Sequence, residues 1–171
     1  MHPCPETLAS AVDQSARLLT RYLAGFDDTN HTAQAEHLPN HAAWTLGHCA
    51  LYMHRLAERL DENPLPADDF SPEPARRAFG TELVAFGSKP SASPDDYPPL
   101  ARCTEIYESA CHRLAHAVRD ADAATLTRPL PWGKSGEFPI WQLVQRITFH
   151  NGTHTGQLAD LRRALGFPAM L

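Results

Sequence analysis

Four segments of the chain repeat their apolar residues every three or four positions, which is the period of an α-helix with one buried face. The predicted helices span residues 5–26, 40–61, 100–121 and 139–166. No alternation of apolar and polar residues is long enough to build a sheet. The pattern therefore predicts an all-α fold, in which the helices bury their apolar faces against one another as in a four-helix bundle.

The ends of these segments carry residues that are typical of helix termini. Asn40 is suited to be the N-cap of the second helix, and Pro139 fits the first turn of the fourth. Gly166 is suited to end that helix. Between the second and third helices lies a proline-rich stretch, residues 63–99, in which we expect one short helix over 75–86. A connection of this length is often functional, and we expect it to cross the bundle or to cover a pocket.

The length of 171 residues suits one domain over residues 1–171. The net charge of −5 gives no electrostatic reason to bind nucleic acid, and no apolar run approaches the roughly 20 residues that cross a bilayer. The first residues lack the basic and then apolar order of a secretory signal. The four cysteines form no CxxC pair, so we expect reduced thiols in a cytoplasmic protein.

His150 and His154 lie at the centre of the apolar stripe of the fourth segment. Residues four apart share one face of a helix, so both imidazoles can reach one metal ion. Two unpaired imidazoles in a core are costly, whereas a neutral imidazole is a good ligand for zinc, nickel or iron. The spacing therefore indicates a site for a divalent metal ion inside the bundle.

The third segment contains the same spacing in His112 and His116, which lie opposite its apolar stripe. We expect this second pair to be solvated. A third ligand for the core pair has to come from the second segment, where His41, His48 and His54 are candidates. The helical period leaves His48 only slightly ahead of His54, and it does not decide between them.

The motif WTLGH at residues 44–48, together with HNGTHTGQL at 150–158 and LRRALG at 161–166, resembles the DinB/YfiT-like superfamily. The resemblance covers the whole chain and implies a four-helix bundle with a long crossover between helices 2 and 3. In this family one histidine of the second helix and an HxxxH pair of the fourth hold a divalent metal. The resemblance therefore implies that His48, His150 and His154 are the metal ligands.

Members of this family include thiol S-transferases that use a low-molecular-weight bacterial thiol and an isomerase that acts on maleylpyruvate with a thiol cofactor. Three histidine ligands leave a fourth position for water or substrate, which is typical of catalytic zinc sites. A metal of this kind lowers the pKa of a bound thiol or water. We therefore expect a metal-dependent enzyme that acts on a small molecule and activates a thiol as a thiolate. The sequence identifies no catalytic residue beyond the ligands.

Other interpretations stay open at this point. Asn151 occupies the position at which HExxH metalloproteases carry their glutamate base. A metal-dependent hydrolase would need a base from elsewhere, and the loop carboxylates Asp68, Asp69, Asp95 and Asp96 are the candidates. A second interpretation is a non-catalytic bundle that binds a metal or a small ligand in a stress response. A third is a bundle whose buried histidines are satisfied by hydrogen bonds without a metal.

Three further residues are candidates for the substrate pocket. Trp44 lies one turn before a histidine of the second segment, and Asn151 follows the first histidine of the fourth. Gln157 lies about one turn beyond His154, where it can bind a ligand, orient a histidine or bond another helix. Phe149 faces away from the apolar stripe, as a residue in a homodimer contact would.

Overall fold

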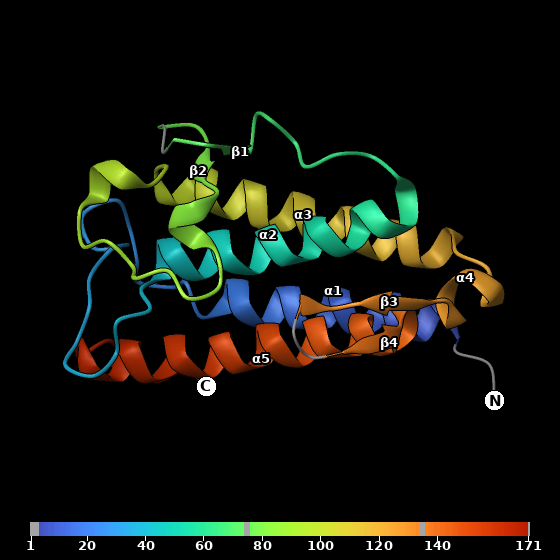
Figure 1. Ribbon diagram of the computed structural model, residues 1–171. Coiled ribbons are helices and arrows are strands. Elements are labelled where there is room, and N and C mark those ends of the chain that lie inside the picture. Colours follow the sequence, from blue (N-terminus) through green and yellow to red (C-terminus); the bar gives the residue numbers. More distant parts are fainter. Residues whose placement is uncertain (1–3, 74–75, 134–135, 171) are drawn as a thin grey trace.

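Four long helices lie side by side in the computed structural model, which describes residues 4–73, 76–133 and 136–170 (Figure 1). They are α1 (Pro5–Arg21), α2 (Ala42–Asp61), α3 (Leu100–Asp120) and α5 (Ile140–Ala164). Helices α1 and α5 run in one direction, and α2 and α3 run in the other (Figure 1). Because α2 and α3 are parallel neighbours, the chain between them has to return along the bundle. The predicted all-α bundle with a long connection between its second and third helices is confirmed.

The apolar faces of these helices meet in one hydrophobic core. Its fully buried side chains include Leu19 of α1, Leu46 and Met53 of α2, Tyr107 of α3 and Leu143 of α5. Burial of each such side chain stabilises the fold by about 1.5–3 kcal/mol. This packing fixes α2 against α5, and it is therefore what brings the histidines of the two helices together.

Helix α2 is covered on all sides over its first three turns, because every residue from 42 to 51 is buried. Gly47 permits this covering, since a Cβ atom at that position would lie 2.7 Å from the ring of Phe79. A bundle helix normally exposes one face to water. The additional layer over α2 explains why the helical period could not select among its histidines.

The crossover between α2 and α3 contains short elements that the sequence did not predict. Strands β1 (Phe70–Ser71) and β2 (Phe79–Gly80) pair in parallel, and η1 (Glu82–Val84) and η2 (Pro94–Asp96) are single 3₁₀ turns. The helix expected over 75–86 is wrong, although residues 74 and 75 lie outside the described residues. The Phe79 side chain is fully buried and its N–H bonds the Asp69 carbonyl, so tertiary contacts decide its extended backbone.

A short helix and a hairpin precede α5. They are α4 (Ala123–Thr127), β3 (Pro129–Pro131) and β4 (Glu137–Pro139), and the two strands pair in antiparallel fashion. Strands of two or three residues are too short to show the alternation that predicts a sheet, and for this reason they were not predicted.

Several helix ends differ from the sequence prediction. Helix α1 stops at Arg21, five residues before the predicted end at residue 26. His41 rather than Asn40 is the N-cap of α2, because its Nδ1 accepts a hydrogen bond from the N–H of Trp44. Pro139 precedes α5 as its N-cap, so the helix itself begins at Ile140. The predicted end of α5 is confirmed, since Gly166 has a φ of +77° just beyond it.

Two further sequence expectations agree with the structure. All four cysteines are free thiols, and Cys49, Cys103 and Cys111 are buried in the helical core. Among the described residues, no helix has the length and apolar character needed to cross a membrane.

Candidate metal centre

His48 of α2 and His150 and His154 of α5 direct their Nε2 atoms toward one point between the two helices. The Nε2 atom of His150 lies 3.0 Å from that of His48 and 3.2 Å from that of His154. A set of potential ligand atoms, one from each ring, lies within 4.8 Å of one another. The bundle thus brings together three nitrogen donors from positions that are far apart in the sequence.

Hydrogen bonds on the outer side of two rings determine their tautomers. His48 Nδ1 lies 2.8 Å from the carbonyl oxygen of Val84, and His154 Nδ1 lies 2.9 Å from Gln157 Oε1. Both oxygens can only accept a hydrogen bond, so each Nδ1 atom carries the proton. The Nε2 atoms of His48 and His154 therefore present lone pairs to the centre.

This arrangement fits a divalent cation. His150 Nδ1 is buried without a hydrogen-bond partner among the described residues, and a proton on its Nε2 could point at only one of the two facing lone pairs. Without a cation, at least one lone pair stays unsatisfied in a buried site. A metal ion accepts all three lone pairs at once, and three imidazoles suit zinc, nickel or iron. The three histidines are therefore a candidate metal site.

Burial keeps these imidazoles neutral, which is the form that binds metal. It lowers the pKa of His48 to about 4, and the positive charge of Arg55 acts in the same direction. Burial also lowers the pKa of His150 to about 3, to which the two neighbouring histidines add, while the adjacent Asn151 side chain opposes the shift. The pKa of His154 is lowered as well, chiefly by burial. At neutral pH the three imidazoles are thus in the form that can bind a metal.

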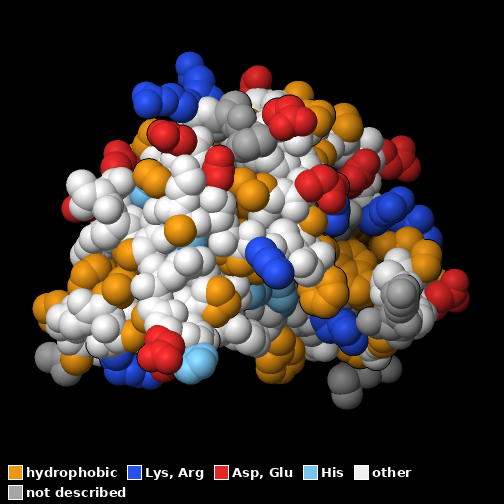
Figure 2. Space-filling view, turned by 60° about the vertical axis from the view of Figure 1, so that its left-hand side comes forward, with side chains coloured by type: hydrophobic (Ala, Val, Ile, Leu, Met, Phe, Trp, Pro, Cys, Tyr) orange, Lys and Arg blue, Asp and Glu red, His pale blue; other side chains and the backbone are white. Residues whose placement is uncertain are grey.

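Aromatic side chains form the walls of the centre. The Trp44 ring stacks on His48, with 4.4 Å between centroids and 14° between planes, and it meets His154 edge-on. The Tyr52 ring lies 5.0 Å from His48 and 5.9 Å from His150. Of the three histidines, only His150 is partly exposed. Figure 2 shows histidine side chains recessed near the middle of one face of the molecule, so a small ligand can approach from the solvent.

Three successive turns of α2 hold one segment of the crossover, residues 83–88. Trp44 Nε1 donates to the Leu83 carbonyl and to Ser88 Oγ, at 3.1 and 3.0 Å. One turn on, His48 bonds the Val84 carbonyl, and a further turn on, the Tyr52 hydroxyl accepts from the N–H of Phe86. The crossover is therefore part of the centre, as expected for a connection of this length.

The pocket candidates have different roles in the structure. Trp44 lines the centre, and Gln157 orients His154 while its Oε1 also accepts from Asn40 Nδ2 at 3.0 Å. Asn151 instead lies in the core, where its Nδ2 donates to Ser15 Oγ at 3.2 Å. The structure thus places Asn151 among the bundle helices and not in the pocket. Sequence reasoning assigned Asn40 to a helix cap, because nothing local connects it to a residue on the fourth helix.

The other histidines of α2 have structural partners elsewhere. His41 caps the helix and its Nε2 lies 2.9 Å from the Ser91 carbonyl. His54 Nδ1 lies 3.1 Å from the Arg113 guanidinium, and its Nε2 lies 3.8 Å from Asp69. Neither ring reaches the centre, which leaves His48 as the ligand candidate from α2.

The loop carboxylates also have other partners. Asp69 forms an ion pair with Arg102 at 2.5 Å, and Asp96 accepts a hydrogen bond from Ser91 Oγ. Asp68 and Asp95 are exposed, and no carboxylate in the described part of the chain hydrogen-bonds any of the three rings. The structure therefore supplies no general base to the centre from these loops.

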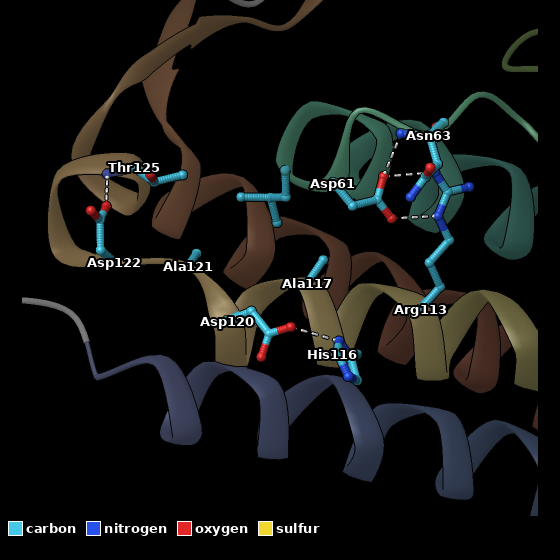
Figure 3. Close-up of a pocket in the computed structure, with 10 residues that line it drawn as sticks. Asp61, Asn63, Arg113, His116, Ala117, Asp120, Ala121, Asp122 and Thr125 are labelled. Atoms are coloured by element: carbon cyan, nitrogen blue, oxygen red, sulfur yellow. Dashed lines mark hydrogen bonds and ion pairs between the residues drawn. The ribbon is translucent and has the colours of Figure 1, made fainter.

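A groove of about 570 Å³ lies between α3, the end of α2 and α4 (Figure 3). Its charged side chains pair with one another, Arg113 with Asp61 at 2.8 Å and His116 with Asp120 at 2.9 Å. None of the three clustered histidines lines it. Because its charges are already satisfied, the groove gives no reason to place the functional site there.

A comparison with known protein families identifies the family of the chain. Residues 11–158 match the DinB superfamily, and this span contains α2 and all three clustered histidines. A comparison with curated proteins finds no significant match. Since the match covers most of the chain, the protein belongs to the DinB superfamily.

Proposed function

We propose that this protein is a metal-dependent thiol S-transferase, in which His48, His150 and His154 hold a divalent ion. The single observation that carries the metal site is the convergence of three Nε2 atoms, two of which have tautomers determined by Val84 and Gln157. A divalent cation at this point would satisfy all three nitrogen lone pairs at once. Membership of a superfamily that often contains metal-dependent enzymes supports the proposal.

An ion held by the three histidines would have one coordination position free for a substrate. Three nitrogen ligands leave a fourth position open on a four-coordinate ion, and the partly exposed His150 marks the side from which a substrate enters. A divalent ion held there supplies the positive charge that lowers the pKa of a bound thiol or water. The rings of Trp44 and Tyr52 form apolar walls beside the candidate ligand nitrogens.

A thiol suits the centre better than water does as the nucleophile. A thiol has a pKa of about 8.5, whereas that of water is about 15.7, so a thiol needs less help to lose its proton. The described residues place no carboxylate beside the rings to act as a base. In the proposed reaction the S–H proton passes to solvent and the sulfur forms a bond to an electrophilic carbon. The leaving group departs with the electron pair of the bond that breaks.

The first test is metal content, measured by inductively coupled plasma mass spectrometry on untagged protein. We expect about one divalent ion per chain, as a single three-histidine site requires. His150→Ala should abolish it, and the matched control His112→Ala, which changes the exposed pair of α3, should retain it. Absence of metal after reconstitution with zinc, nickel or iron would overturn the proposal.

The second test is catalysis, measured as the fluorescence of monobromobimane when cysteine displaces its bromide. We expect the loaded protein to accelerate the displacement and the His150→Ala variant to lose the acceleration. Hydrolysis of ester substrates without thiol transfer would show a hydrolase instead. Metal binding without turnover across thiols and electrophiles would show a non-catalytic binding protein.

A further inference from the structure

Arg55 lies on the same face of α2 as His48, two turns further along and about 10 Å along the helix axis. Its Cζ atom lies 5.4 Å from the centroid of the Tyr52 ring. The same ring contacts His48 and His150, at 5.0 and 5.9 Å between centroids. A guanidinium and two of the candidate ligands therefore share one aromatic neighbour, which places Arg55 beside the metal centre.

The Arg55 guanidinium has no carboxylate partner within the described ranges of the chain. Arg102, Arg113 and Arg119 each form an ion pair with an aspartate or glutamate. Arg55 is half-buried and contacts the face of Tyr52 instead. The chain has a net charge of −5, yet two positive charges would lie close together here. One is the guanidinium of Arg55, and the other is the metal ion for which the three histidines form a candidate site.

The position of Arg55 is prepared by its neighbours. The Tyr52 hydroxyl is held by the N–H of Phe86 at 3.0 Å, so the ring beneath the guanidinium is fixed by the crossover. Side chains on a helix lean toward its N-terminus, which directs Arg55 back toward Tyr52 and His48.

We propose that Arg55 binds a carboxylate of the thiol substrate while the sulfur occupies the three-histidine centre, so that the site selects anionic thiols over neutral ones. Guanidinium groups match the planar geometry of a carboxylate and form two parallel hydrogen bonds with it. The inference rests on the proposed function, because it assigns the chemical class of the thiol. Arg55 is then a specificity-determining residue.

The test uses cobalt-substituted protein, in which thiolate binding changes the visible and near-ultraviolet absorption of the ion. Dissociation constants are measured for mercaptopropionate and for its neutral isostere mercaptopropionamide. We expect Arg55→Met to weaken mercaptopropionate about tenfold and to leave the amide unchanged, because one charge-assisted interaction is lost. Arg55→Lys should retain part of the preference for the anion. Arg59→Met, the same change at an exposed arginine one turn further along α2, should retain all of it.

The outcomes separate the inference from the function on which it rests. If Arg55→Met has the same ratio of the two dissociation constants as the wild-type protein, and its cobalt spectrum is intact, the role of Arg55 is overturned. The proposed metal centre is not affected by that result. An equal loss in Arg59→Met also overturns it, because the effect would then come from overall charge. If the wild-type protein gives no cobalt spectrum, the proposed function fails and the inference fails with it.

Discussion

The histidine pairs of α5 and α3 have the same spacing but different surroundings. His150 and His154 face a third histidine, His48, across the bundle, and burial lowers the pKa of each of these three rings. His112 and His116 are exposed on α3, as predicted. The spacing is a local property of one helix, whereas a third ligand depends on the helix packed against it.

The comparison also concerns orientation. On α5, Gln157 holds the Nδ1 atom of His154, so the ring presents its Nε2 lone pair before any ion arrives. On α3, His116 forms a surface contact with Asp120 at 2.9 Å and can rotate away from its neighbour. A site whose ligands are already oriented loses less conformational entropy on binding. Equal spacing therefore does not imply equal affinity.

The largest effect is expected when the third nitrogen donor is removed. His48→Ala leaves the α5 pair intact but makes it a two-histidine site like that of α3. We expect metal affinity to fall at least roughly 100-fold, because one of three coordinate bonds is lost. The measurement is competition for zinc with a chromophoric chelator. A double change of His112 and His116 to alanine should leave the affinity unchanged, and a loss as large as that of His48→Ala would contradict the assignment.

Acid should destabilise the metal-free protein through the buried histidines. The pKa of His48 is about 4 in the folded state and about 6.5 when exposed, so the unfolded state binds more protons between these values. The free energy of unfolding should therefore fall as the pH drops from 6.5 to 4, by about 3 kcal/mol from this residue. Urea unfolding at a series of pH values measures it. His48→Asn should reduce the slope, whereas a slope that also changes in His112→Asn would point to a general charge effect.

Gln157→Ala tests whether orientation distinguishes the two pairs. Loss of the hydrogen bond to His154 should lower metal affinity about 10- to 100-fold, as is typical of residues that orient a ligand. The bound protein should still contain about one ion per chain when zinc is in excess. Gln145→Ala changes an exposed glutamine of the same helix and is the matched control. Equal affinities in the two variants would show that the orienting bond has no effect.

The smallest expected effect concerns the layer that covers α2. In Gly47→Ala the added Cβ would lie 2.7 Å from the Phe79 ring, so the crossover has to shift. We expect a loss of about 1–3 kcal/mol in the free energy of unfolding, measured by urea. Gly152→Ala on α5 adds a methyl group that has no neighbour within 4 Å beyond its own stretch of helix, so it should be neutral or stabilising. A neutral Gly47→Ala would mean that the crossover adapts without strain.

The sequence predicted the features that depend on local geometry. Apolar residues at helical spacing predicted the long helices, and the spacing of His150 and His154 predicted two donors on one face. The paired strands Phe70–Ser71 and Phe79–Gly80 were missed, because their extended backbone comes from packing on α2. Asn151 was predicted to line the pocket because it follows His150 in the sequence. In the structure, the rotation of α5 turns its side chain toward Ser15.

That His150 and His154 share a helix face follows from their spacing alone, since 3.6 residues per turn is a property of the backbone. Tertiary structure decided which histidine of α2 joins them. His41, His48 and His54 are all buried, because the crossover covers the side of α2 that a bundle would expose. The rotation of α2 against α5 selects His48, and the Val84 carbonyl, supplied by the crossover, determines its tautomer. No local pattern encodes a contact between residues so distant in the chain.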